Sequence, residues 1–192
     1  MRSIRIGAMR GLALALALAV ARAQQSPIGE DEAKSTRVKV GEKAPDFTCT
    51  PIAGEEFSLS KQQGKVVLVN FFATWCGPCL AELPHLEKEI MKKYGDRPDF
   101  KMIVIGREHN TEDLKKFAEQ KKLALPMAPD PKREIYGKYA EQFIPRNFIV
   151  GKDGKIKLAS VGYTETSFQE IAQTLEKELK QPATSDQVSA RN

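Results

Sequence analysis

Two cysteines three positions apart are the residues of this 192-residue chain with the clearest capacity for chemistry. Residues 75–79 read Trp-Cys-Gly-Pro-Cys and follow an apolar run that ends at Phe72. We expect the run to be a strand and the cysteine pair to begin a helix. Backbone N–H groups without partners and the positive end of the helix dipole would then favour a thiolate over a thiol. Because the two side chains are one helical turn apart, Cys76 could attack a partner's disulfide and Cys79 could resolve the mixed disulfide.

Other uses of a Cys-x-x-Cys pair lack the residues they require. A structural zinc site needs four ligands, and beyond the pair the chain offers only Cys49, His85 and His109. Covalent haem attachment needs His directly after the second cysteine, and position 80 is Leu. We therefore expect a redox pair without a metal or cofactor; a disulfide that only staples the helix is the alternative. Cys49, on an expected strand, is interpreted as a small buried apolar side chain.

The first 23 residues have the three parts of a secretory signal peptide. Arginines at positions 2, 5 and 10 precede an apolar run over 11–21, and Ala21-Arg22-Ala23 suits signal peptidase. A membrane-spanning helix needs roughly 20 apolar residues, so this run is too short to be one. We expect cleavage after Ala23, no stable membrane anchor afterwards, and a periplasmic or otherwise exported protein in which disulfides persist.

The basic character of the chain belongs mainly to this leader. The full sequence has 30 basic and 25 acidic residues, a net charge of +5, and residues 1–23 contain four of the arginines and no acid. Removing them leaves 26 basic against 25 acidic residues, a net charge of +1. A nearly neutral chain gives no bulk electrostatic reason to bind nucleic acid.

Strand and helix patterns alternate over residues 38–180, which we expect to form one domain between a flexible lead-in at 24–37 and a flexible tail at 181–192. The expected strands cover residues 46–50, 65–72, 100–105, 147–150 and 155–161. The expected helices begin near Cys76, after an N-cap at Asn110, and at Ser167, which has Glu170 in capping-box spacing. This order predicts an α/β sandwich with a mixed sheet.

At this point the chain resembles the thioredoxin superfamily and, within it, the exported TlpA/ResA-like thiol–disulfide oxidoreductases. The matching segments are Ala-Pro-Asp-Phe at 44–47, residues 67–79, Glu82 and Pro84, Ile144-Pro145, and the hairpin sequences at 147–150 and 153–156. The resemblance spans about residues 40–180. It implies a thioredoxin-like three-layer sandwich with a mixed central sheet and an N-terminal strand extension.

The resemblance also implies roles for individual residues. Cys76 would be the exposed nucleophile and Cys79 the buried resolving thiol. The surface that binds a client would contain Trp75, Gly77, Pro78, Ile144 and Pro145. Pro145 would be a cis-proline that lies against the disulfide, whereas the residues alone favour an ordinary turn proline. Trp75 would shield the cysteine pair, with simple packing at a strand end as the alternative.

Glu82 lies three residues beyond Cys79 and therefore on the same side of the expected helix. Members of the subfamily similarly carry a glutamate there, which implies that Glu82 handles the proton of Cys79. The plainer alternative is a solvated helix carboxylate. Asn70 stands where thioredoxin itself has a buried aspartate, and since asparagine cannot titrate, Glu82 becomes the stronger candidate.

The function implied by the resemblance is reduction of disulfide-containing client proteins, with electrons from a membrane-bound donor; apocytochrome c is one candidate client. A peroxiredoxin-like thiol peroxidase is an alternative, because residues 44–47 also resemble the opening of those enzymes. They have Thr three residues before the reactive cysteine, however, and Ala73 occupies that position. A non-catalytic thioredoxin-fold binding module is the other alternative. Assays of peroxide consumption and insulin reduction separate the three.

Overall fold

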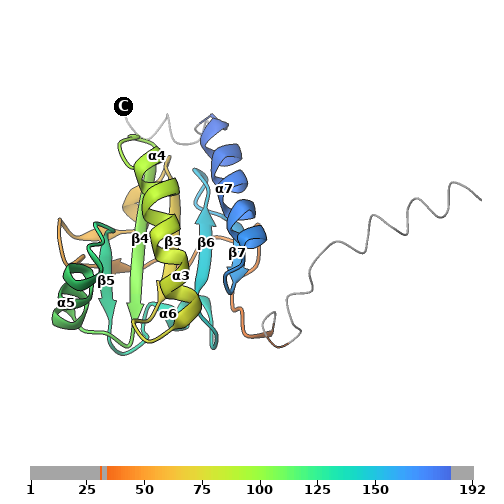
Figure 1. The fold of residues 1–192 in the computed structure, drawn as a ribbon. Helices are drawn as coiled ribbons and strands as arrows, with labels where there is room; N and C mark the ends of the chain where they lie inside the picture. Colours follow the sequence, from red (N-terminus) through yellow and green to blue (C-terminus); the bar gives the residue numbers. More distant parts are fainter. Residues whose placement is uncertain (1–30, 32–33, 183–192) are drawn as a thin grey trace, which may run out of the picture. The chain divides into compact units, whose positions relative to one another are not determined.

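A five-stranded mixed sheet is the centre of the computed structural model, which describes residues 31 and 34–182. Its strand order is β5-β4-β3-β6-β7 (Figure 1). The strands are β3 (Val66–Phe72), β4 (Phe100–Arg107), β5 (Met127–Asp130), β6 (Arg146–Val150) and β7 (Ile156–Val161). β3, β4 and β5 are parallel, whereas β6 is antiparallel to both β3 and β7. The predicted mixed sheet is confirmed.

The helices cover this sheet on two sides. The cysteine pair begins α3 (Gly77–His85), which continues through the π-helical segment η2 (Leu86–Met91) into α4 (Lys92–Tyr94). The other helical elements are η1 (Ser60–Gln62), α5 (Thr111–Lys121), α6 (Tyr136–Tyr139) and α7 (Glu165–Lys180). In Figure 1, α3 and α7 lie in front of the sheet.

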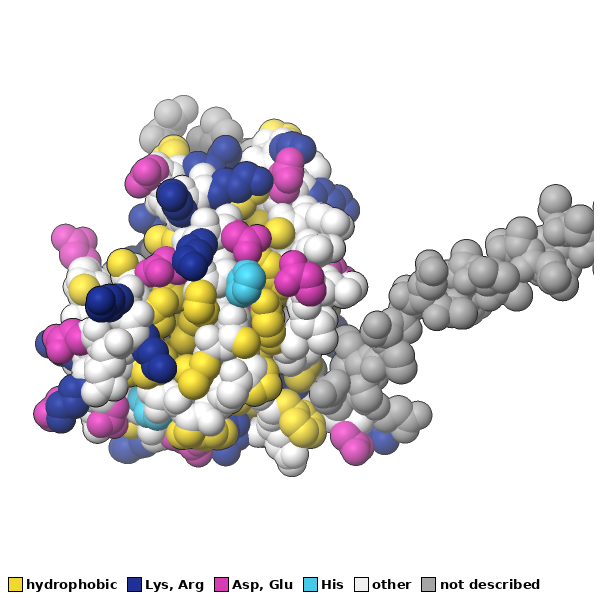
Figure 2. All heavy atoms as spheres, viewed as in Figure 1, with side chains coloured by type: hydrophobic (Ala, Val, Ile, Leu, Met, Phe, Trp, Pro, Cys, Tyr) yellow, Lys and Arg dark blue, Asp and Glu magenta, His cyan; other side chains and the backbone are white. Residues whose placement is uncertain are grey.

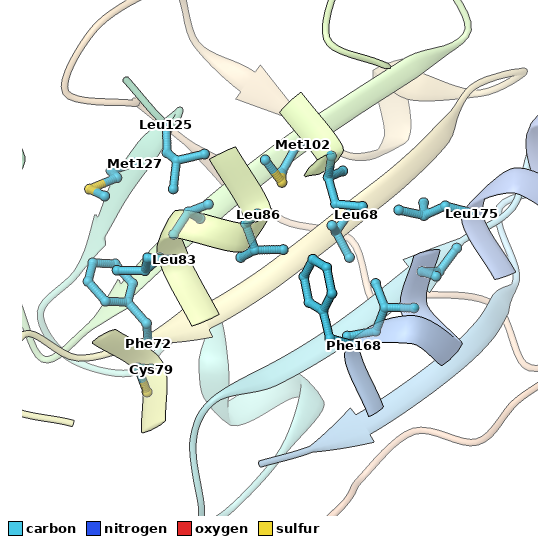
Figure 3. Packing of buried hydrophobic residues seen from close by; sticks show 14 of the residues in the cluster. Leu68, Phe72, Cys79, Leu83, Leu86, Met102, Leu125, Met127, Phe168 and Leu175 are labelled. Atoms are coloured by element: carbon cyan, nitrogen blue, oxygen red, sulfur yellow. The ribbon is translucent and has the colours of Figure 1, made fainter. Parts of the chain in front are cut away.

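The side chains of β3 alternate between two apolar layers, as the pleat of a strand requires. Leu68 and Phe72 pack in the layer that contains the buried residues of α3 and α7. Figure 3 shows Leu86 of η2 and Phe168 of α7 in this layer, close to Leu68. A strand that is buried on both faces carries consecutive apolar residues, which is why residues 65–72 show no alternation of apolar and polar types.

The opposite face of the sheet is covered by α6 and by a small sheet of β1 (Thr48–Cys49) and β2 (Phe57–Ser58). Tyr136 and Tyr139 of α6 pack edge-on or tilted against Phe71. The helices, the sheet and this second cover make three layers, so the predicted thioredoxin-like sandwich is confirmed. The N-terminal strand is present as β1, but it pairs with β2 and not with the central sheet.

The last helix begins earlier than the sequence pattern predicts. Thr164 is its N-cap and Ser167 is its third residue, so the expected start at Ser167 is wrong. The Thr164 hydroxyl accepts from the Ser167 N–H, and the Ser167 hydroxyl accepts from the Thr164 N–H. Thr164 and Ser167 thus form the capping box, and Glu170 is not part of it.

The packed part of the chain also begins before residue 38. Thr36 forms a β-bridge with Ala140, and the Arg37 N–H donates to the Tyr139 carbonyl. The expected leader at 1–23, most of the lead-in at 24–37 and most of the tail at 181–192 lie outside the described residues. Within the part that is described, no helix has the length and apolarity needed to cross a membrane.

Candidate active site

The two cysteines form a disulfide at the start of α3, on the loop that follows β3. Cys76 is the N-cap of the helix, and the Cα atoms of Cys76 and Cys79 are 5.3 Å apart. The backbone N–H of Cys79 donates to Sγ of Cys76 over 3.3 Å. An N–H group aimed at this sulfur would stabilise negative charge on it once the disulfide is opened.

The two sulfurs differ in accessibility. Cys76 is 6% exposed and Cys79 is fully buried in this oxidised state. Cys76 is therefore exposed only by comparison with Cys79, and the expectation of an openly exposed nucleophile is too strong. Gly77 and Pro78, between the two cysteines, are both exposed at the surface. An approaching partner therefore meets this dipeptide and the edge of Cys76.

A cis-proline loop lies against the disulfide. The Ile144–Pro145 peptide bond is cis, as the family resemblance predicts and the residues alone do not. The carbonyl oxygen of Ile144 lies 3.7 Å from Sγ of Cys76. This contact joins two residues that are 68 positions apart in sequence. Pro145 itself is buried, Ile144 is half-buried, and Phe143 before them is 40% exposed.

Buried polar groups hold this loop in place. Arg146 is fully buried, and its guanidinium donates to the carbonyls of Gln142 and Phe143 and to the hydroxyl of Thr36. The Tyr136 hydroxyl also donates to the Phe143 carbonyl, over 2.7 Å. Arg146 is not among the residues that its sequence context predicts for the site; the available signal was a charged residue next to the apolar strand that follows Pro145.

Trp75 lies on the surface next to the disulfide. Its side chain is 63% exposed, so the alternative that it only fills space at a strand end is wrong. Figure 2 shows apolar side chains exposed at the lower end of the molecule, where α3 begins in Figure 1. The guanidinium of Arg107 is 5.6 Å from the centre of the Trp75 ring.

Glu82 lies on the side of α3 that faces the sheet, where it is buried and is not a solvated carboxylate. It is 1% exposed, and both of its oxygens accept hydrogen bonds from amides of the sheet. Asn70 Nδ2 donates to Oε2 over 2.9 Å, and Asn147 Nδ2 donates to Oε1 over 2.6 Å. Asn70 also donates to Asn147, its direct neighbour across β3 and β6.

The environment of Glu82 contains opposing influences on its ionisation. Burial raises its pKa from 4.5 to about 7, while the amide donors of Asn147 and Asn70 and the charge of His85 oppose that rise. A carboxyl group with this pKa can change its protonation state near neutral pH. The sequence pattern predicts only that Asn147 lies in a hairpin strand. The feature that could have indicated its role is an amide side chain at the start of the apolar run over 147–150.

His109 supports the loop that carries the cysteines. Its Nε2 accepts the backbone N–H of Thr74 over 3.0 Å, and the ring is buried beside Phe72. Nε2 can accept only when the imidazole is neutral, and burial lowers the pKa of His109 in agreement with this. The histidine therefore has a structural role in positioning the active-site loop.

The third cysteine lies apart from this chemistry. Cys49 is buried and free, as predicted, and burial together with the nearby charge of Asp130 raises the pKa of its thiol to about 12. Among the residues that the structure describes, no group of three or more His, Cys, Asp or Glu side chains could hold a metal ion.

Comparison with known proteins places this geometry in a family. Residues 40–159 match the AhpC/TSA family. Over 130 residues the chain is 32% identical to the thiol-disulfide oxidoreductase ResA of Bacillus cereus, and the match covers 68% of this chain and 74% of that relative.

Solved structures agree with the sequence comparison. The solution structure of a candidate protein disulfide isomerase from Bacteroides thetaiotaomicron has a TM-score of 0.73 and 38% identity, covering 77% of this chain and 94% of that one. The crystal structure of the exposed lipoprotein thioredoxin of Streptococcus pneumoniae has a TM-score of 0.60 and 29% identity, covering 69% and 99%. The chain is therefore similar to proteins that exchange thiols and disulfides.

Proposed function

Because this chain belongs to the AhpC/TSA family and is a thiol–disulfide oxidoreductase, we propose that it reduces disulfide bonds in client proteins outside the cytoplasm. The observation that carries the proposal is the Cys76–Cys79 disulfide at the N-terminus of α3, with the cis Ile144–Pro145 bond beside it. A sulfur pair that can open and close, next to a loop with exposed apolar groups, suits a protein substrate.

The reaction begins from the reduced dithiol. The Cys76 thiolate attacks one sulfur of the client disulfide, which forms a mixed disulfide and releases one client thiolate. Cys79 then loses its proton and attacks Sγ of Cys76, which restores the Cys76–Cys79 bond and releases the second client thiolate. Both client thiolates take up protons, two electrons pass to the client, and a donor must reduce the enzyme before the next cycle.

The roles of the two cysteines follow from their surroundings. Cys76 is the more accessible sulfur, and it receives the N–H of Cys79, which favours the thiolate. Cys79 is fully buried, so it reacts with Cys76 and not with a client. We assign to Glu82 the acceptance of the Cys79 proton, because a buried carboxyl with a pKa of about 7 shares the helix face of Cys79.

Client docking is assigned to the groups around the disulfide. Trp75, Gly77 and Pro78 form one side of this surface, and Ile144 and Pro145 form the other. The exposed side chains of Trp75 and Phe143 beside the disulfide support an extended segment of a partly unfolded client. The family resemblance supports a membrane-bound electron donor and apocytochrome c as one client class, and the signal-like leader supports export.

A trapping experiment tests this function. In the Cys79→Ser variant, the resolving thiol is missing, so mixed disulfides between Cys76 and clients should accumulate in extracts of the exported compartment. Dithiothreitol should reduce these mixed disulfides and release the clients. The matched control is Cys76→Ser, which keeps one buried thiol but lacks the attacking sulfur. The function is wrong if Cys79→Ser traps no more protein than this control.

The same protein separates the alternatives. The parent should accelerate insulin reduction by a thiol donor, whereas a disulfide that only staples α3 gives no acceleration. Peroxide consumption by the parent should stay at the level of the Cys76→Ser control. A peroxidase would show the opposite pattern, with peroxide consumed faster than insulin is reduced.

A further inference from the structure

The exposed Trp75 ring lies beside the guanidinium of Arg107, which also lies over the ring of Tyr136. Arg107, the last residue of β4, lies one position beyond Gly106, which pairs with Phe72 of β3. Arg107 is therefore next to the loop that carries Trp75. Its guanidinium lies 5.6 Å from the centre of the Trp75 ring and 5.1 Å from the centre of the Tyr136 ring.

Tyr136 is a rigid base for this stack. It is fully buried, its backbone N–H donates to Asp130, and its ring packs edge-on against Phe71 at 5.3 Å. Its hydroxyl donates to the carbonyl of Phe143, in the loop that precedes the cis-proline. Tyr136 thus contacts Arg107 on one side and the cis-proline loop on the other.

The charges around Arg107 indicate how it is oriented. Its Nη2 atom is 3.4 Å from a carboxylate oxygen of Glu108, and the other oxygen of Glu108 is 3.7 Å from Arg133. Its Nε atom is buried without a hydrogen-bond partner among the described residues. The two rings and Glu108 are therefore the contacts that set the plane of the guanidinium.

We propose that Arg107 is a positioning residue for client binding: its guanidinium stacks between Trp75 and Tyr136 and so sets the distance of Trp75 from the cis-proline loop across the disulfide. This inference rests on the proposed function, because it gives Trp75 the task of contacting the client. Arg107 does not touch the reacting sulfurs. Its loss affects how a protein client binds, not how Cys76 attacks a small disulfide.

The chain offers a direct reporter, because Trp75 is its single tryptophan. In Arg107→Met the stack loses its cation, so fluorescence anisotropy decay should show faster motion of the Trp75 ring. The KM for insulin should rise about two- to fivefold, as expected for loss of a cation–π contact at an exposed site. The kcat for insulin and the rate of attack on Ellman's reagent should stay at the parental values.

Two further variants separate stacking from charge. Arg133→Met removes the other cation of Glu108, and Arg133 stacks on Tyr136 without touching Trp75, so it should keep parental anisotropy and KM. Arg107→Lys keeps the charge but lacks the planar guanidinium, so its values should lie between parent and Arg107→Met. This variant also decides the question if Arg107→Met fails to fold.

The proposal is overturned if Trp75 moves no faster in either Arg107 variant, or if Arg133→Met raises KM as much as Arg107→Met does. An equal rise would mean that net charge, and not the stack, attracts the client. Failure of the proposed function has a different signature: the parent itself would not reduce insulin, while the anisotropy comparison would still report whether Arg107 holds Trp75.

Discussion

Glu82 shows how a single side chain acquires a property that its residue type does not have. A carboxyl group in water ionises far below neutral pH, and two amide donors would lower its pKa further. Burial beneath α3 outweighs both influences and brings the pKa to about 7. Asn70 and Asn147 cannot titrate, so they orient the carboxyl group without competing for its proton.

Replacing Glu82 tests its role as a proton acceptor. In Glu82→Gln, resolution of a mixed disulfide by Cys79 should slow by about a hundredfold at pH 8, the lower end of the usual contribution of a general base. In the parent, the resolution rate should rise through pH 7 as Glu82 ionises, and this step should be missing in the variant. Rapid-quench kinetics from pH 5 to 9 measure both.

Glu89 provides the matched control, since it is an exposed glutamate of the same continuous helix and pairs with His85. Glu89→Gln should follow the parental pH profile. If Glu82→Gln follows it too, the proton-handling role is wrong.

Stability should also depend on the protonation of Glu82, with a definite sign. Its folded pKa of about 7 lies above its ordinary value of 4.5, so the folded protein binds the proton more tightly than the unfolded chain does. The stabilising contribution is complete below pH 4.5 and is lost as the pH rises through 7. At pH 8 the loss amounts to roughly 3 kcal/mol, from 1.36 kcal/mol per pH unit.

Urea denaturation at pH 5 and pH 8 measures this contribution to the free energy of unfolding. The difference between the two pH values should be smaller in Glu82→Gln than in the parent by that order of magnitude. Equal differences would mean that Glu82 ionises in the folded protein as it does in water.

At the scale of elements, α3 is the part that joins the chemistry to the core. Its first turn carries the disulfide, and buried residues at the expected helical spacing continue from α3 through η2 into α4: Leu83, Leu86, Ile90 and Tyr94. Pro84 lacks a backbone N–H, and the helix continues past it as the π-helical segment η2. The apolar spacing therefore predicts the buried face correctly, whereas the local backbone geometry does not follow from it.

The capping box of α7 gives a test at the same scale. Thr164→Ala removes the hydroxyl that accepts the Ser167 N–H, which should lower the free energy of unfolding by about 1 kcal/mol. Thr166→Ala is the control, because Thr166 is an exposed residue of the same helical turn and does not cap it. Urea denaturation should place this control within about 0.5 kcal/mol of the parent. Equal losses in both variants would contradict the assignment of Thr164 as N-cap.

At the scale of the whole molecule, positive and negative charges are nearly balanced outside residues 1–23. Figure 2 shows basic and acidic side chains mixed over the face formed by α3 and α7, and without residues 1–23 the net charge is +1. This face thus presents no strong field of one sign, which agrees with our proposal that clients are recognised by the groups around the disulfide.

Export has a simple test by mass. When the full chain is produced in a bacterium with a secretory pathway, the intact mass of the protein from the exported compartment should correspond to a chain that begins at Gln24. A control with Ala21 and Ala23 both changed to Leu should block cleavage and keep the full mass in the membrane fraction. Recovery of the uncleaved parent from the cytoplasm would contradict export.

The sequence by itself determined the redox pair, the strands that precede and follow α3 along the chain, and the mixed sheet. These features depend on the local spacing of residues and on continuous apolar runs, which are typical of strands covered on both faces. The sequence did not reveal β5, since Pro126 and Pro129 interrupt the pattern and only an edge strand tolerates a proline there. The start of α7 was also missed, because Thr164 and Ser167 are both good N-caps.

Only the tertiary structure decided the environment of the site. Asn70, Glu82 and Asn147 come from three separate elements, and their hydrogen bonds exist because α3 packs across β3 and β6. The contact between Trp75 and Arg107 likewise joins the loop after β3 to the end of β4. Burial, and with it the pKa of a carboxyl group or the exposure of an indole, depends on what the folded chain places around a residue, which local sequence does not encode.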